Sequence, residues 1–216
     1  MNVGKTRSVY LIWFGIFLVW SIYRAWFKLP EAIDELVVKP LIFVLPVIWW
    51  VKYREKRKLE SIGITGRNFF QEIYIGVGIG VLFALEGLVA NYFKYGTWSF
   101  APLAALSSVG LMPFLLYSLF TSVSEEILGR GFVYGRLQEG AKDQLKPAIV
   151  ASFLFLLLHI PIIFTRLNLV GVSLVVYIVS IFLLGVTNSY LYSYRKSLVV
   201  SILVHIFWNA TVALYL

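Results

Sequence analysis

Long apolar runs, separated by short polar stretches rich in Lys and Arg, dominate this sequence. A helix needs about 20 predominantly apolar residues to cross roughly 30 Å of hydrocarbon, since each residue adds about 1.5 Å. On this measure the pattern predicts membrane spans at residues 9–27, 36–51, 72–93, 109–129, 147–165, 169–193 and 197–216. The second run is short and contains Pro40 and Pro46, which favours a kinked or partly re-entrant helix. We therefore expect residues 1–216 to form a single membrane domain, an all-α, polytopic transmembrane bundle of about seven spans.

The composition supports an integral membrane protein. Hydrophobic residues make up 60% of the chain and charged residues 14%, more apolar surface than a soluble domain of this size could bury. Trp49, Trp50, Trp98, Tyr190 and Tyr192 lie near the ends of apolar runs, as is typical of aromatic belts at membrane interfaces. The chain has no cysteine, which excludes thiol nucleophiles and cysteine metal sites.

The formal net charge of +8 arises mainly from basic residues between the apolar runs. This placement favours membrane topology and anionic lipid headgroups as its cause, and we expect no nucleic-acid partner. If the N-terminus is cytoplasmic, fourteen Lys and Arg residues lie inside, and five lie outside: Arg24, Lys28, Lys39, Lys94 and Arg166. The positive-inside rule therefore predicts a multi-pass protein of the cytoplasmic (plasma) membrane with its N-terminus in the cytoplasm. An eighth short span would move one end of the chain to the other side.

Three polar clusters interrupt the apolar runs of the second half of the chain. They are Glu125-Glu126 with Arg130, His159 four residues after Phe155, and His205 four residues before Asn209. The chain contains no other histidine. Ionisable side chains are costly in hydrocarbon, so they usually face a bundle interior and serve catalysis, transport or pairing. Their joint occurrence on three successive segments predicts one assembled site.

The spacing within these clusters suggests a division of labour. Glu126 and Arg130, four residues apart, share a helix face and can form an ion pair. Glu125 is rotated by about 100° from Glu126, which leaves it available as a base. A Glu and a His that hold a water can activate it toward an amide carbonyl, and a second His with an Asn can donate hydrogen bonds to the oxyanion. The same residue types also suffice for a zinc site with Glu125, His159 and His205 as ligands and an open water position.

The predicted topology also suggests where the site opens. Glu125 falls near the cytoplasmic end of its span, and His205 lies about 12 Å from the same side, eight residues after Ser197. His159 falls near the middle of the fifth span, which Pro161 is expected to bend. We therefore expect a site open to the cytoplasmic half of the bilayer. Gly76, Gly78 and Gly80 are interpreted as close-packing positions between helices, and Glu86 is left out of the site.

Glu125-Glu126-x-x-x-Arg130, Phe155-x-x-x-His159 and His205-x-x-x-Asn209, in this order on successive spans, resemble the CPBP family. This family comprises CAAX-processing proteases and bacteriocin-processing or self-immunity proteins, also called the Abi family. The resemblance covers about residues 105–216 and implies an intramembrane endopeptidase with an all-helical core. It implies that Glu125 and His159 activate the water and that His205 and Asn209 stabilise the oxyanion. Glu126 and Arg130 would support the site.

The resemblance favours a metal-independent, glutamate-type protease, so no cofactor is expected, with zinc as the alternative. The primary hypothesis is an endopeptidase that cleaves a membrane-associated protein or peptide. A version of this hypothesis gives the cleavage a role in bacteriocin self-immunity. The alternatives are a non-proteolytic membrane scaffold or immunity protein, and a proton-coupled transporter, whose intramembrane Glu and His would form a relay. Transporters more often show duplicated, broken helices, and the sequence shows no internal repeat.

Overall fold

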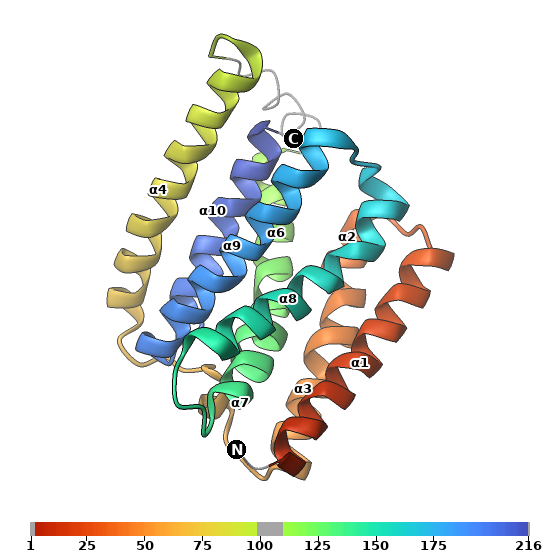
Figure 1. Cartoon of the computed structure of the whole chain (residues 1–216), viewed down its shortest axis with the longest axis vertical. Coiled ribbons are helices and arrows are strands. Elements are labelled where there is room, and N and C mark those ends of the chain that lie inside the picture. The colour runs from red at the N-terminus through yellow and green to blue at the C-terminus, as the bar shows by residue number, and fades with distance from the viewer. Residues whose placement is uncertain (1–2, 99–109, 216) are drawn as a thin grey trace.

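The computed structural model describes residues 3–98 and 110–215, which form a bundle of helices without any strand in these ranges (Figure 1). The α-helices are α1 (Val3–Trp26), α2 (Glu31–Ile33), α3 (Leu45–Trp49), α4 (Phe69–Tyr95), α6 (Leu111–Glu126), α7 (Gly135–Gln138), α8 (Leu145–Ile162), α9 (Gly171–Arg195) and α10 (Val199–Tyr215). The π-helical segments are η1 (Asp34–Val38), η2 (Pro40–Val44), η3 (Trp50–Arg54), η5 (Ile127–Tyr134) and η6 (Ile163–Leu167), and η4 (Leu59–Ile62) is a 3₁₀-helix. The predicted all-α fold is confirmed.

Five helices in the described part of the chain are long and apolar enough to cross a membrane. They are Thr6–Trp26, Phe69–Val89, Leu111–Gln138, Leu145–Leu167 and Gly171–Arg195, and a shorter apolar helix covers Val199–Val212. These six correspond to the first and the third to seventh predicted spans. The predicted boundaries at 109 and 216 lie outside the described residues. The protein is thus a multi-pass membrane protein.

The second predicted span is part of one helical run from Glu31 to Arg54. Pro40 and Pro46 lie inside this run, which alternates between α and π turns around them. Because proline lacks an N–H and its ring clashes with the carbonyl four residues earlier, wider turns relieve the strain at such positions. The run also carries Asp34, Glu35 and Lys39, all of them buried. Counting Lys39 among the loop charges was therefore wrong, because its side chain points into the bundle.

The fourth predicted span is longer than expected. α6, η5 and α7 follow one another without a break from Leu111 to Gln138, well beyond the predicted end at residue 129. The reason is that η5 is mostly apolar and entirely buried, so the helix continues into the bundle core past the Glu125 cluster. Glu125 consequently lies near the middle of its span, whereas the sequence predicts a position near one end.

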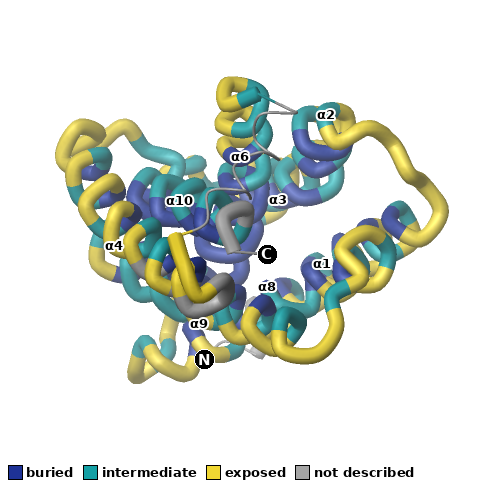
Figure 2. The backbone as a smooth tube through the Cα atoms, turned by 90° about the horizontal axis from the view of Figure 1, so that it is seen from above, coloured by how far each residue is buried: buried dark blue, intermediate teal, exposed yellow. Residues whose placement is uncertain are grey.

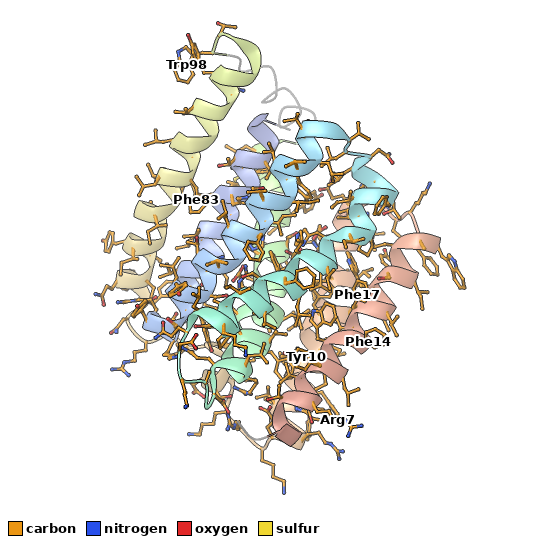
Figure 3. The ribbon with its side chains drawn as sticks, in the orientation of Figure 1. Arg7, Tyr10, Phe14, Phe17, Phe83 and Trp98 are labelled. Atoms are coloured by element: carbon orange, nitrogen blue, oxygen red, sulfur yellow. The ribbon has the colours of Figure 1, made fainter. Side chains whose placement is uncertain are left out.

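Exposed aromatic side chains lie at both ends of the bundle. We call the end with the start of α1 the N-terminal end, and the end with the α1–α2 connection, the start of α6 and the end of α10 the distal end (Figure 1). Exposed aromatic side chains occur at both: Trp26, Phe27, Trp98 (labelled in Figure 3) and Phe164 at the distal end, and Trp49, Tyr53, Phe69, Phe70, Tyr74 and Tyr194 at the N-terminal end. The prediction that Tyr192 belongs to such a belt is wrong, because its side chain is buried against Tyr134.

Small residues let α4 lie directly against α10. Gly76 faces Leu203, Gly80 faces Phe207, and Gly87 faces Thr211, whose hydroxyl donates a hydrogen bond to the carbonyl of Phe83. A Cβ on Gly76 would lie 2.8 Å from the Cβ of Leu203, too close for real atoms. The close-packing interpretation is thus correct for Gly76 and Gly80. It is wrong for Gly78, beside which a Cβ would meet nothing within 4 Å.

We predict that Gly76→Ala lowers the thermal midpoint of the detergent-solubilised protein, with a loss of about 1–3 kcal/mol in stability, as is typical of overpacking. Gly78→Ala is the matched control on the same helix, and it should leave the midpoint unchanged or raise it, because alanine favours helices over glycine. Equal midpoints for the two variants would contradict this account of the α4–α10 interface.

Candidate active site

A cavity of about 250 Å³ lies inside the bundle, between α1, the Glu31–Arg54 run, α6, α8, α9 and α10. Four of the six residues singled out in the sequence line it: Glu125, His159, His205 and Asn209. The other two, Glu126 and Arg130, are fully buried beside it. Figure 2 looks down on the distal end and shows buried residues along the facing sides of these helices. The fold thus brings three clusters from three separate helices to one place.

Glu125 lies at the centre of this arrangement. Its Oε2 is 3.5 Å from Nε2 of His159 and 3.7 Å from Nε2 of His205. Its Oε1 is 2.9 Å from Nζ of Lys39. One oxygen of the carboxylate is therefore neutralised by an ammonium group, while the other faces both imidazoles.

His159 is held by its own helix. Its Nδ1 lies 2.9 Å from the carbonyl oxygen of Phe155, one turn earlier. A carbonyl only accepts, so Nδ1 carries the proton and donates it, and in the neutral ring Nε2 is an acceptor. Nε2 therefore faces Oε2 of Glu125, a buried oxygen without a hydrogen-bond partner among the described residues. A single water molecule, which has two hydrogens to donate, can form a hydrogen bond to each of these two neighbouring acceptors.

His205 is held by the neighbouring carboxylate. Its Nδ1 donates to Oε1 of Glu126 over 2.8 Å, which directs Nε2 toward Glu125. The same Oε1 lies 3.1 Å from Nη1 of Arg130 and 3.1 Å from Nδ2 of Asn188. The predicted Glu126–Arg130 ion pair is thus formed, and the guanidinium also lies 4.0 Å above the ring of Phe155. With these three contacts Glu126 orients the site, and because it is fully buried and does not line the cavity, it does not face the space where a substrate would bind.

Asn209 lies one turn beyond His205 on α10 and lines the same cavity. Its amide donates to Oγ of Ser118 over 2.9 Å and to Oγ of Ser122 over 3.4 Å. The second contact is at the long limit of a hydrogen bond, so this N–H can be redirected at little cost.

Several polar residues of the site were not among those singled out in the sequence. Lys39 bridges Glu125 and Glu35, with its Nζ 2.6 Å from Oε2 of Glu35, which also accepts a hydrogen bond from Thr121. Glu35 and Lys39 are four residues apart in an apolar run, a spacing that indicates an intrahelical pair. Asn188 is a polar residue inside the apolar α9, and such a position is itself a signal of an interhelical contact.

The cavity extends from Glu125 toward the distal end. On α6 its lining residues run from Glu125 back to Phe114, and on α10 they run from His205 forward to Val212. Beyond Glu125, in the opposite direction, Leu128, Phe132 and Val133 of η5 are at most 1% exposed. The prediction of a site open toward the end of the bundle that holds the N-terminus is therefore wrong. The physical reason is the apolar continuation of α6, which fills that half of the bundle.

The residues proposed as zinc ligands fit a metal poorly. In residues 3–98 and 110–215, no group of three His, Cys, Asp or Glu side chains is arranged to hold a metal ion. The carboxylate of Glu125, which both histidines face, already contacts the ammonium of Lys39, and a second cation there would be repelled in a low-dielectric site.

Residues 106–211 match the family model described as Rce1-like, type II CAAX prenyl endopeptidase Rce1-like. This match contains all six residues singled out in the sequence, and it confirms the resemblance to the CPBP intramembrane proteases. No curated protein and no solved structure shows a significant match to the chain.

Proposed function

Through residues 106–211 the chain belongs to the Rce1-like family of CAAX-type proteases, and we propose that it is a metal-independent intramembrane endopeptidase. It hydrolyses a peptide bond of a membrane-associated protein or peptide with a water activated by Glu125 and His159. The observation that carries this proposal is the approach of Oε2 of Glu125 to Nε2 of both histidines inside a cavity of the bundle.

The hydrolytic water is held by the two neighbouring acceptors. It donates one hydrogen to Nε2 of His159 and the other to Oε2 of Glu125, which leaves its lone pair free to attack the substrate carbonyl. As the new C–O bond forms, one proton of the water passes to this pair of bases. The same proton then moves to the amide nitrogen, the C–N bond breaks, and a carboxylic acid and an amine leave. His159 is suited to the transfer because its Nδ1–H is fixed on the Phe155 carbonyl.

The oxyanion is stabilised by groups on α10. Nδ1 of His205 already donates to Glu126, so the ring can donate to the oxyanion through Nε2 only when that nitrogen also carries a proton. This Nε2–H donates to the developing oxyanion. Asn209 supplies a second donor by giving up its long contact with Ser122. These roles agree with those that the family resemblance implies.

Lys39 is a positioning residue in this mechanism. Its ammonium balances the charge of Glu125 and occupies Oε1, so Oε2 remains directed at the histidines. A buried carboxylate without such a partner would tend to take up a proton and lose its ability to accept one from water.

The buried apolar segment η5 supports a hydrolytic chamber over a transport pathway. A transporter needs access to its central site from both ends of the bundle, whereas the fully buried Leu128 and Phe132 pack the bundle beyond Glu125. Self-immunity toward a bacteriocin is retained as the proposed cellular role, through cleavage of the peptide or of a membrane partner.

We predict that Glu125→Gln and His159→Ala lower the rate of peptide cleavage by the purified protein in liposomes by about 10²–10⁴-fold, the usual contribution of general acid–base catalysis. Glu60→Gln, a change at an exposed carboxylate far from the cavity, is the matched control and should retain the rate. Retention of full activity in both site variants would refute the proposed function.

Lys39→Met is expected to reduce kcat far more than it changes KM, because it leaves substrate contacts in place but removes the partner of Glu125. Lys39→Arg should retain most of the rate. The double variant Lys39→Met/Glu35→Gln removes the second unpaired carboxylate and should restore thermal stability without restoring kcat. If it restored kcat as well, Lys39 would be a structural residue only.

Metal independence is tested by elemental analysis of the purified protein and by its cleavage rate with 1,10-phenanthroline. We expect no stoichiometric zinc and an unchanged rate, because Lys39 opposes a cation at Glu125. Stoichiometric zinc that is lost in His159→Ala, together with inhibition by the chelator, would reverse this assignment.

A further inference from the structure

The lining residues place the mouth of the cavity at the distal end of the bundle, the end from which Figure 2 views the backbone. Its outermost lining residues are Glu31, at the start of α2, Phe114, in the first turn of α6, and Val212, near the end of α10. Glu31 is exposed, whereas Glu35 and Lys39, one and two turns further along the same run, are buried. The cavity thus leads from the surface at this end down to Glu125.

The basic residues are concentrated at the opposite end. Thirteen Lys and Arg residues lie at the N-terminal end by their place along the helices: Lys5, Arg7, Lys52, Arg54, Lys56, Arg57, Lys58, Arg67, Arg136, Lys142, Lys146, Arg195 and Lys196. Four lie at the distal end, namely Arg24, Lys28, Lys94 and Arg166, and the remaining two, Lys39 and Arg130, are buried inside. The positive-inside rule therefore places the N-terminal end in the cytoplasm, as the sequence predicts, and the distal end outside.

The cavity has a negative charge balance. The carboxylate and ammonium side chains that line it are Glu31, Glu35, Lys39 and Glu125, which sum to −2 when all are ionised, and the balance stays negative with His205 protonated. Aromatic rings of Phe114, Tyr117, Tyr177 and Trp208 form much of the remaining wall. Inside a membrane protein, where charges are weakly screened, such a chamber favours a chain that is apolar but carries a basic side chain.

We propose, on the basis of the function proposed above, that the site is reached from the extracytoplasmic side. Its substrates are peptide segments exposed at the outer face of the membrane, with a Lys or Arg close to the bond that is cut. Glu31 attracts this basic side chain at the mouth, and the aromatic wall accommodates the apolar residues around it. Chains presented at the cytoplasmic face have no route to Glu125, because η5 fills the bundle on that side.

The side of access can be measured without any catalytic assay, because the chain has no cysteine. Single-cysteine variants Glu31→Cys and Tyr117→Cys, at the mouth and inside the cavity, would be treated in intact cells with a membrane-impermeant thiol reagent. Both are expected to react, and Lys56→Cys at the N-terminal end should react only after permeabilisation. Labelling of Lys56→Cys alone in intact cells would overturn the inference, whatever the enzyme does.

The substrate class is tested with a single-span peptide inserted in either orientation into membranes that contain the wild-type protein. We expect cleavage of the outward-facing segment only, and a loss of about tenfold or more in kcat/KM when its Lys is changed to Glu. Glu31→Lys should reverse this preference. Cleavage of the inward-facing segment, or indifference to the Lys→Glu change, would overturn the inference. Absence of all cleavage, with Glu31→Cys labelled from outside, would refute the proposed protease while the side of access stands.

Discussion

The cost of placing charge inside a membrane bundle governs this structure. Two adjacent carboxylates, Glu125 and Glu126, are buried near the middle of a span, and each is neutralised by a different cation. Glu126 uses Arg130 of its own helical run, whereas Glu125 uses Lys39 from a helix far away in the sequence. Removing either cation would leave an uncompensated charge in a low-dielectric interior, a loss of about 3–5 kcal/mol for buried pairs. The charge pairs of the site and the packing of these helices therefore depend on each other.

This pairing separates the chemical roles of the two carboxylates. Oε1 of Glu126 has contacts with Arg130, His205 and Asn188, and the fully buried side chain does not line the cavity, so this group orients an imidazole without reaching a bound substrate. Glu125 keeps one oxygen free of hydrogen bonds in the described part of the chain, directed at both histidines. Two carboxylates that differ only in their surroundings can thus act as support and as base. The support reaches beyond the family match at 106–211, because Lys39 lies outside it.

The unbroken helical run that contains α6 decides where the cavity lies along the bundle. The uninterrupted run from Leu111 to Gln138 places Glu125 at mid-depth and continues beyond it as the wholly buried, mostly apolar η5. The prolines of the Glu31–Arg54 run permit π turns, and this run carries Glu35 and Lys39 to the opposite wall. A chamber closed on one side and open on the other follows from these two features together. The proposed access from outside combines this direction of opening with the positive charge of the closed end, which the positive-inside rule assigns to the cytoplasm.

The sequence by itself determined everything that depends on local periodicity. Apolar runs of membrane-spanning length predict helices, a spacing of four pairs Glu126 with Arg130, and the expense of burying His159 and His205 implies that they meet in the interior. Tertiary structure alone decided that Lys39 is a site residue and not a loop charge, that Tyr192 is core and not interface, and that Gly78 faces outward while Gly76 faces α10. It also decided that the cavity opens at the distal end. The physical reason is that these properties depend on which helix faces which, a choice made by packing between segments far apart in the chain.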